Sequence, residues 1–497
     1  MNGLRWRLTG VVMAWVLVAP LAEAANVKQE VDRYISGFHQ KGLFNGTVLV
    51  ANERGILLKK GYGAANLEWK VPNAPDTKFR IGSITKSFTA TVILQLAAEG
   101  KLQLDDPITK HLPDYRKDTG DRVTITHLLN HTSGIPSYTS KPAIMKDADG
   151  FESVAAFVKK ACSDDLEFEP GTKYAYNNSG YFLLGAIIEK LTGQTYAEAV
   201  QARILGPLGM KDTGYDVSAT VLPKRASGYA QAPGGIVNAA WLDMNLPYAA
   251  GSLYSTVEDL YRWERAFHGD TLLPAALKQK MLTPGLAHYG FGWVMSDMTL
   301  HDGKTKLPGI FHTGGINGFS SILVRVPERK EAVILLDNMT HGGLQELAGG
   351  VLSILHGLTP RPARMPIGNV MMESLGKGSV AQAIATYRTL KKTKQAEYDF
   401  SERHLNTVGY HLLRSGRAAD AIEVFKLNVE MFPEAANCHD SLGEAYAAHG
   451  DKARAITSYR KALELAPKNE HAVKMLEQLE EPAAKRGGSL EHHHHHH

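Results

Sequence analysis

Two periods of hydrophobic positions predict the elements in the first part of the chain. Apolar side chains recur every three or four positions in VKQEVDRYISGFHQ (27–40) and in SITKSFTATVILQLAAE (83–99), and Gly100 ends the second run. This spacing predicts two helices. Between them, GTVLVANERGILLKKGYGAANLEW (46–69) has the composition of strands, with a turn at residues 52–55. We therefore expect a helix, a strand hairpin and a long core helix, in that order.

The middle of the chain is predicted to be helical, with two strands after it. Thr256 and Asp259 form a helix-capping signal ahead of DLYRWERAF. FSSILVRV (319–326) and EAVILLDN (331–338) then flank a turn at residues 327–330. Helices in the middle with antiparallel strands at both ends predict an α/β domain whose sheet joins the two ends of the segment.

A proline-rich stretch and an internal repeat follow. TPRPARMPIG (359–368) holds three prolines and cannot continue a helix, which predicts a linker. Beyond it, the segment 380–390 is a candidate partner helix, and a glycine, an aromatic residue and a proline each recur 34 residues later: Gly409 and Gly443, Phe425 and Tyr459, Pro433 and Pro467. This period resembles that of tetratricopeptide repeats. We interpret the repeats as a helical cap that stabilises the rest, with a peptide-binding groove as the alternative.

The N-terminus has the features of an export signal. Arg5 and Arg7 precede an apolar run from Val11 to Val18, which is followed by Ala-Glu-Ala at residues 22–24. This pattern predicts a secretory signal over residues 1–24, and the apolar run is too short to span a bilayer. We expect a protein that is periplasmic or secreted and has no membrane span.

Composition excludes some partners and some scaffolds. The net charge of +4 comes from 55 basic and 51 acidic residues spread along the chain, so no nucleic-acid partner is predicted. Cys162 and Cys438 fall in different predicted domains, which argues against a disulfide scaffold. The terminal LEHHHHHH is an expression tag, so its histidines predict no metal site.

A serine hydroxyl needs a neighbouring base to become a nucleophile. Ser-x-x-Lys occurs three times, at Ser83, Ser374 and Ser458. Only Ser83 is predicted at the start of a helix, where free backbone N–H groups favour negative charge, with Lys86 one turn further on. Tyr-x-Asn occurs at Tyr176 to Asn178, and His-Thr-Gly occurs at residues 312–314.

These three motifs, in this order, resemble the serine β-lactamase and penicillin-binding-protein superfamily. The likeness is to the branch of class C β-lactamases, D-alanyl-D-alanine carboxypeptidases, D-aminopeptidases and family VIII esterases, over roughly residues 30 to 355. It extends to recurring segments of that branch: LLNHTSGIPSY, ILGPLGMKDTGY, AAGSLYSTVEDL and YGFGW. The resemblance implies an antiparallel sheet flanked by helices with an all-helical subdomain beside it.

The expected organisation is therefore a signal (1–24), a β-lactamase-like domain (25–358), a linker (359–378), a small all-α repeat domain (379–482), and a tail with the tag (483–497).

The resemblance also implies roles for the catalytic residues. Ser83 would be the nucleophile, Lys86 would keep its surroundings positive and share the proton, and Tyr176 would act as general base and then acid. Backbone N–H groups of Ser83 and Gly315 would form the oxyanion hole. No metal and no organic cofactor is expected.

For the substrate, the resemblance implies that Asn178 hydrogen-bonds its side chain and that His312, Thr313 and Gly314 line the strand that holds it. Class C β-lactamases usually carry Lys where this chain has His312. A neutral imidazole attracts a carboxylate less than an ammonium does, and protonation of His312 at lower pH would supply that charge.

We therefore predict a serine hydrolase that forms an acyl-enzyme on a small ester, an amide or a D-amino-acid peptide. Two alternatives stay open. One is a penicillin-binding sensor or scaffold that signals to a protein partner through its repeats, and the other is a class C-like β-lactamase. His131 in LLNHTSG is interpreted as holding a loop rather than as a metal ligand.

Overall fold

The computed structural model describes residues 4–146 and 150–481, with side chains from residue 22 onward. The chain forms two compact units. The first comprises the residues up to Ala230 and Asn238–Pro362, and the second comprises Gln231–Val237 and the residues from Ala363 onward. The predicted tail and tag (483–497) lie outside the described residues.

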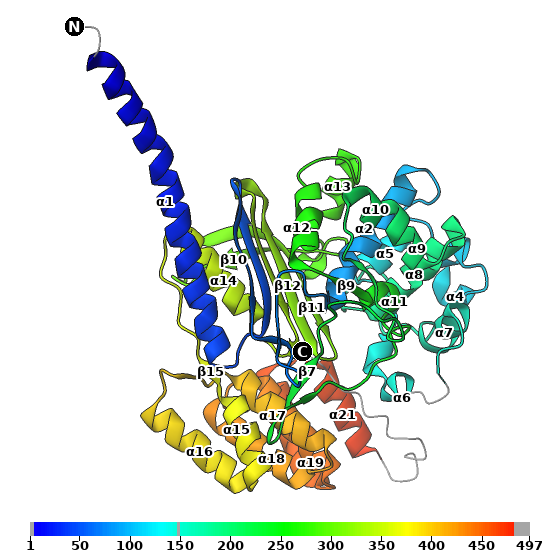
Figure 1. The fold of residues 1–497 in the computed structure, drawn as a ribbon. Coiled ribbons are helices and arrows are strands. Elements are labelled where there is room, and N and C mark those ends of the chain that lie inside the picture. The colour runs from blue at the N-terminus through cyan, green and yellow to red at the C-terminus, as the bar shows by residue number, and fades with distance from the viewer. Residues whose placement is uncertain (1–3, 147–149, 482–497) are drawn as a thin grey trace. The chain divides into compact units, whose positions relative to one another are not determined.

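A six-stranded antiparallel sheet is the centre of the first unit (Figure 1). Its strand order is β10-β11-β12-β13-β1-β2. The strands are β1 Gly46–Asn52, β2 Gly55–Tyr62, β10 Val294–Thr299, β11 Lys306–Ile316, β12 Phe319–Val326 and β13 Glu331–Asp337. Because β1 pairs with β13, from Gly46 opposite Asp337 to Ala51 opposite Ala332, the sheet joins the two ends of the unit, as predicted.

Helices cover both faces of this sheet, since every residue of β12 and β13 is buried. Helix α14 (Leu344–Leu355) packs on β12 and β13, and α1 (Leu4–Gln40) packs on β2 and on α14. Helix α12 (Val257–Ala266) packs on β13 and β1 and lies on the other side of the sheet in Figure 1. Thr256 caps α12 by accepting a hydrogen bond from the backbone N–H of Asp259, as the sequence predicted.

The remaining helices of the first unit gather into a helical subdomain beside the sheet (Figure 1). They are α2 Thr85–Ala98, α3 Ile108–His111, α4 Lys117–Gly120, α5 Ile125–Leu129, α6 Pro142–Met145, α7 Val154–Ala161, α8 Asn178–Thr192, α9 Tyr196–Val200, α10 Gly206–Leu208, α11 Tyr248–Gly251 and α13 Ala275–Met281. Helix α2 packs on α8 and α11, and the short 3-10 helix η1 (Gly82–Ile84) just before it packs on β11 and β12. The segment from η1 to α2 therefore bridges sheet and subdomain.

Short strands complete the first unit. Strands β3 Ala64–Asn66 and β4 Val71–Pro72 form one pair, while β5 Phe79–Arg80, β9 Leu253–Ser255 and β6 Gly214–Tyr215 form a small sheet. Strand β14 (Met339–Thr340) pairs in parallel with Tyr229 and Ala230 at the start of β7 (Tyr229–Ala232), and β8 spans Gly235–Asn238. The predicted α/β fold with an antiparallel sheet and an all-helical subdomain is confirmed.

The second unit is helical, with α15 Ile367–Lys377, α16 Val380–Thr393, α17 Glu402–Arg414, α18 Ala418–Met431, α19 Ala436–Ala448, α20 Lys452–Leu465 and α21 Glu470–Glu480, and one short strand pair, β15 Met365–Pro366 with β16 Tyr398–Asp399. The linker predicted over 359–378 is too long. Residues 367–377 form α15, because Ile367, Met371 and Leu375 recur at helical spacing and bury one face. The part of the predicted linker that is not helical therefore ends at Pro366, directly before α15.

The 34-residue period has a direct packing cause. A Cβ atom on Gly409 in α17 would lie 2.3 Å from the ring of Phe425 in α18, and one on Gly443 in α19 would lie 3.1 Å from the ring of Tyr459 in α20. Each glycine therefore lets the aromatic residue of the paired helix approach the backbone, and the buried rings fill the core.

A histidine-carboxylate pair at the end of β13 makes stability depend on pH. His341 Nε2 donates to Asp337, and Nδ1 donates to the Gly342 carbonyl at 2.8 Å. Burial alone would lower the pKa of His341, but the attraction and hydrogen bond of Asp337 outweigh it and raise the pKa to about 9. The stabilisation is therefore complete below the unfolded-state pKa of about 6.5 and is lost as the pH rises through about 9.

We predict that His341→Gln lowers the melting temperature of the first unit at pH 6 by about 2–4 °C for each 1 kcal/mol lost. The difference from the parent should shrink by pH 9.5. All six tryptophans precede residue 294, so tryptophan fluorescence follows the first unit alone. A difference that stays constant from pH 6 to 9.5 would contradict the ion pair.

Candidate active site

Ser83 lies in η1, the turn that leads into the buried helix α2. The turn begins at Gly82, whose φ of 51° is in the left-handed region that favours glycine. The Ile81 N–H donates to the Leu253 carbonyl at 2.9 Å and ties the turn to β9. Backbone N–H groups in the first turn of a helix have no intrahelical partner, so the N–H of Ser83 is available to an oxyanion.

Strand β11 approaches this turn so closely that only glycine fits at the contact. A Cβ atom on Gly314 would lie 2.1 Å from the Ile81 carbonyl oxygen, and one on Gly82 would lie 2.9 Å from the backbone nitrogen of Gly315. Ser321 on β12 adds a hydrogen bond from Oγ to the same Ile81 oxygen at 3.0 Å. The structure thus brings Ser83 and Gly315 together, as the predicted oxyanion hole requires.

One edge of β11 is open beside the nucleophile. Its pairing with β10 ends at Phe311, whereas its pairing with β12 continues to Ile316. Thr313 and Gly315 are exposed, and a Cβ atom on Gly315 would meet nothing within 4 Å. An acyl group therefore has room to lie along residues 312–316.

Lys86 is the most constrained side chain of the site. It is 0% exposed, and Nζ lies 2.8 Å from Ser83 Oγ, 2.7 Å from Asn178 Oδ1 and 2.9 Å from the carbonyl oxygen of Ala250. Burial lowers the pKa of Lys86 well below its usual value. Burial thus moves the amine toward the form that can accept a proton.

The partners of Lys86 define how a neutral amine would be oriented. The Ala250 carbonyl can only accept a hydrogen bond, and so can Asn178 Oδ1, because Asn178 Nδ2 donates to Thr139 Oγ1 at 3.0 Å. Two acceptors take both N–H groups of the amine. An ammonium at Lys86 donates its third N–H to Ser83 Oγ, whereas in a neutral amine the lone pair takes this place and faces the hydroxyl proton of Ser83.

Tyr176 lies beside both Ser83 and Lys86. Burial raises the pKa of the phenol above its usual range, although a hydrogen bond with Ser83 opposes the shift. The Lys86 amine lies 4.7 Å from the centre of its ring. Tyr176 is therefore a protonated phenol beside the nucleophile, and 40% of the residue is exposed.

The Tyr-Asn-Asn segment is held by the loop between α5 and α6. Asn177 caps α8 by accepting from the N–H of Gly180, and its Nδ2 donates to the Ile135 carbonyl. The backbone N–H of Asn178 donates to Ser137 Oγ at 3.1 Å. Every residue from 176 to 178 thus has a fixed place relative to Lys86.

His312 is buried and neutral. Its Nδ1 donates to the Thr313 carbonyl at 2.6 Å, so its Nε2 accepts from the Tyr289 hydroxyl at 2.8 Å. Burial first, and repulsion from Lys86 whenever that amine is protonated, lower the pKa of His312 to about 3. The expectation that this imidazole gains a proton at mildly acidic pH is wrong, because both its nitrogens are engaged and it is 3% exposed.

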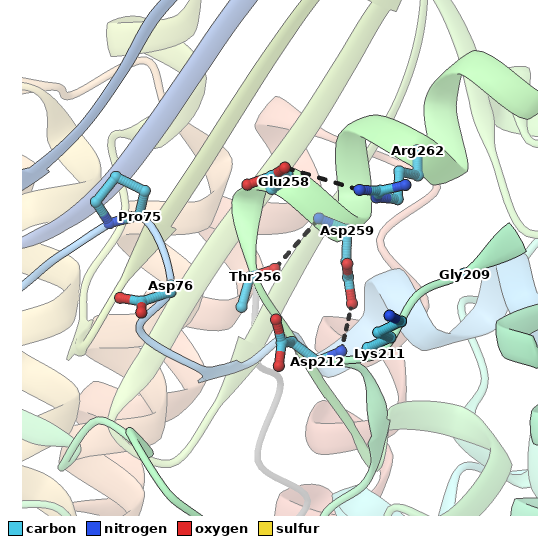
Figure 2. Close-up of a pocket in the computed structure, with 9 residues that line it drawn as sticks. All are labelled: Pro75, Asp76, Gly209, Lys211, Asp212, Thr256, Glu258, Asp259 and Arg262. Atoms are coloured by element: carbon cyan, nitrogen blue, oxygen red, sulfur yellow. Dashed lines mark hydrogen bonds and ion pairs between the residues drawn. The ribbon is translucent and has the colours of Figure 1, made fainter.

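A separate polar pocket lies at the start of α12 (Figure 2). None of its lining residues is a candidate site residue. Asp259 accepts from the backbone N–H of Asp212 at 2.8 Å, and Arg262 faces Glu258, so these charges serve packing between α12 and the segment before β6. Among the described residues, no group of three or more His, Cys, Asp or Glu side chains is placed to hold a metal ion.

The sequence motifs did not include three groups that complete the site: the Ala250 carbonyl, Thr139 Oγ1 and the Tyr289 hydroxyl. Ala250 and Tyr289 lie in AAGSLYSTVEDL and YGFGW, and Thr139 directly follows LLNHTSGIPSY. The recurring segments were therefore the available signal for all three.

A serine activated by a buried lysine, with a tyrosine and an open strand edge beside it, defines a serine acyl-transferase or hydrolase. A sequence model described as Beta-lactamase matches residues 30–354, and one described as Tetratricopeptide repeat matches residues 436–469. The chain belongs to the β-lactamase family. In the described residues, no helix has both the length and the apolar character that a membrane span requires.

Named relatives agree with this assignment. Protein flp of Staphylococcus aureus strain MW2 is 30% identical over 326 residues, and the match covers 63% of each chain. A penicillin-binding protein of Bacillus subtilis strain 168 is 30% identical over 336 residues, which are 63% of this chain and 72% of that protein. The match thus spans less than two thirds of Protein flp.

Solved structures share the fold. The octameric penicillin-binding protein homologue from Pyrococcus abyssi has 29% identity and a TM-score of 0.57, with 67% of this chain and 78% of that chain covered. The D-amino acid amidase from Ochrobactrum anthropi SV3, in complex with L-phenylalanine amide, has 28% identity and a TM-score of 0.57, with 67% and 99% covered.

The two neighbouring glycines of β11 offer a matched test of the close approach. We predict that Gly314→Ala destabilises the first unit by about 1–3 kcal/mol, because its methyl group would collide with the carbonyl oxygen of Ile81. Gly315→Ala should stay within about 0.5 kcal/mol of the parent, since its methyl group points into open space. Urea unfolding followed by tryptophan fluorescence measures both, and equal effects would contradict the described packing.

Proposed function

We propose that this protein hydrolyses small neutral esters or amides, the latter including D-amino-acid amides and peptides, through an acyl-enzyme on Ser83. The observation that carries the proposal is the position of the Lys86 amine, buried and 2.8 Å from the nucleophile. In this proposal Lys86 is the base in acylation and Tyr176 is the acid, which changes the roles that the family resemblance implied.

Acylation needs one proton to travel from the serine to the leaving group. Ser83 Oγ attacks the acyl carbon while its proton moves to the lone pair of Lys86, and the oxyanion accepts hydrogen bonds from the N–H groups of Ser83 and Gly315. The bond to the leaving alcohol or amine then breaks, and that group takes the phenol proton of Tyr176. The new Lys86 ammonium then gives its extra proton to the Tyr176 phenolate, which restores both groups while Ser83 Oγ stays bound to the acyl group.

Deacylation is the same sequence in reverse, with water in place of the leaving group. Tyr176 first passes its proton to Lys86, the resulting phenolate accepts the proton of the attacking water, and the Lys86 ammonium protonates Ser83 Oγ as the bond to the acyl group breaks. Atoms balance as one ester or amide plus one water, giving one acid plus one alcohol or amine.

The preference for neutral substrates rests on His312. With a pKa of about 3 it offers no cation at the position where class C β-lactamases usually carry Lys. The D-amino acid amidase with 28% identity supports an amide as one substrate class. A β-lactam carries a carboxylate and is therefore a poorer fit.

The N-terminal pattern of Arg5, Arg7 and the apolar run supports export to the periplasm or the medium as part of the proposal. The tetratricopeptide repeat supports a protein partner for the second unit, since such repeats form extended binding surfaces.

Ser83→Ala should abolish turnover of every ester and amide while leaving the fold intact, because nothing else in the site can form the covalent intermediate. Intact-protein mass spectrometry with a fluorophosphonate should place one adduct on Ser83. An adduct on another serine, or a variant that still turns substrate over, would refute the proposal.

The neutral state of His312 predicts how the enzyme responds to acid. The ratio of kcat/KM for nitrocefin to that for p-nitrophenyl butyrate should change less than about twofold between pH 7 and pH 5, because a group with a pKa near 3 stays neutral there. A fixed cation in His312→Lys should raise this ratio by roughly five- to thirtyfold. A ratio that rises tenfold in the parent on acidification would show that His312 titrates.

A further inference from the structure

His131 brackets Tyr176 with two hydrogen bonds. Its carbonyl oxygen accepts from the backbone N–H of Ala175 at 2.9 Å, and its Nδ1 accepts from the backbone N–H of Asn177 at 3.0 Å. The residue between these two anchors is Tyr176. The imidazole also lies against the phenol, with ring centres 4.4 Å apart.

The chemistry of these contacts determines the state of His131. Because Nδ1 accepts a backbone N–H, a neutral imidazole must carry its proton on Nε2. Nε2 is buried and has no hydrogen-bond partner among the described residues. Its surroundings are the rings of Tyr176 and Tyr289, both 4.4 Å away between centres, and Tyr181 at 5.2 Å.

Two features of His131 are energetically unfavourable: its backbone conformation and a buried nitrogen without a partner. Its backbone φ is 62°, a left-handed value that is uncommon outside glycine, although asparagine, aspartate and histidine adopt it more often than other residues do. The side chain is 1% exposed and leaves a polar nitrogen unsatisfied. Strain and unpaired polar atoms of this kind concentrate at functional sites.

We propose that His131 is the positioning residue that holds the phenol of Tyr176 over Ser83 for proton transfer to the leaving group. The inference rests on the proposed function, in which Tyr176 is the acid. His131 itself touches no reacting atom.

A neutral His131 keeps its hydrogen bond to the Asn177 N–H as the pH changes. Burial first, and then repulsion from Lys86 and His312 whenever they are protonated, lower the pKa of His131 well below its usual value. The groups that face it from neighbouring elements are Lys86 on α2, Tyr181 on α8, His312 on β11, and Tyr174, Tyr176 and Tyr289 on loops. The acceptor at Nδ1 is therefore kept at pH values where an exposed imidazole would be protonated.

Two esters of one acid test the role. Ethyl butyrate and p-nitrophenyl butyrate give the same acyl-enzyme, but ethoxide needs a proton to leave, whereas p-nitrophenolate leaves as the anion. Values of kcat/KM report acylation, so their ratio reports proton delivery to the leaving group. Tyr176→Phe serves as the reference and should lower kcat/KM for the ethyl ester by about 10²–10⁴-fold and for the p-nitrophenyl ester far less.

Two variants with side chains of nearly equal shape, His131→Asn and His131→Leu, distinguish a positioning role of His131 from a role in packing alone. Asn at position 131 keeps an acceptor three bonds from Cα, where Nδ1 is now, and tolerates the left-handed backbone. Leu has the same branching but no acceptor. His131→Leu should lower kcat/KM for the ethyl ester about ten- to hundredfold and for the p-nitrophenyl ester less than threefold, whereas His131→Asn should recover the ethyl ester to within about fivefold of the parent.

Fluorophosphonate labelling of Ser83 controls for an intact nucleophile, since fluoride leaves without a proton. If His131→Leu does not fold, His131→Gln replaces it, because its longer side chain moves the acceptor away from the Asn177 N–H. Equal losses on both esters, or no rescue by Asn, would overturn the positioning role while the Ser83 chemistry stands. A Tyr176→Phe variant without ester discrimination, or a parent that cleaves neither ester, would overturn both this inference and the proposed mechanism.

Discussion

The burial of one amine is the constraint on which the site depends. Lys86 is enclosed between α2, α8 and α11, and removing an ammonium from water costs so much that the group shifts toward its neutral form instead. A neutral buried amine still needs partners for its N–H groups. The Ala250 carbonyl and the Asn178 amide provide them, and their positions aim the lone pair at Ser83.

The sheet supplies the second half of the site, because its strand β11 passes close to the turn that carries Ser83. Residues 312–316 of β11 must pass close to the Ser83 turn, and the contact is possible only because Gly82 and Gly314 lack side chains. The pairing of β1 with β13 joins segments almost three hundred residues apart into the same sheet. The nucleophile comes from the helical subdomain and the strand edge comes from this sheet, so the site exists only when both have folded together.

Strong periodicity and residue identity carried most of the prediction. The hairpin over 46–62, the strands at 319–326 and 331–337 and the α2 helix were all predicted, because each buries a regular apolar pattern. Helix α15 was missed because three prolines dominate the stretch before it. The Ala250 carbonyl could not be predicted from chemistry, since every residue has a carbonyl and only the fold decides which one faces an amine.

The histidines show how far identity alone misleads about charge. The identity of His312 suggested a side chain that gains a proton at mildly acidic pH. In the structure its imidazole donates to the Thr313 carbonyl and accepts from the Tyr289 hydroxyl. His131 likewise accepts a backbone N–H. Both are buried beside Lys86, so a cation on either imidazole is opposed by desolvation, and by repulsion whenever Lys86 is protonated.

The proposed resting site therefore has no charged group in contact with Ser83. Charge appears only as the tetrahedral intermediate forms, as an oxyanion near the N–H groups of Ser83 and Gly315 and an ammonium on Lys86. The two charges arise together and stabilise each other in a site of low polarity. An ionised lysine would lower the energy of the resting state as well, which brings no gain in rate. Keeping it neutral until the attack confines its stabilisation to the transition state, and this is the condition for catalysis.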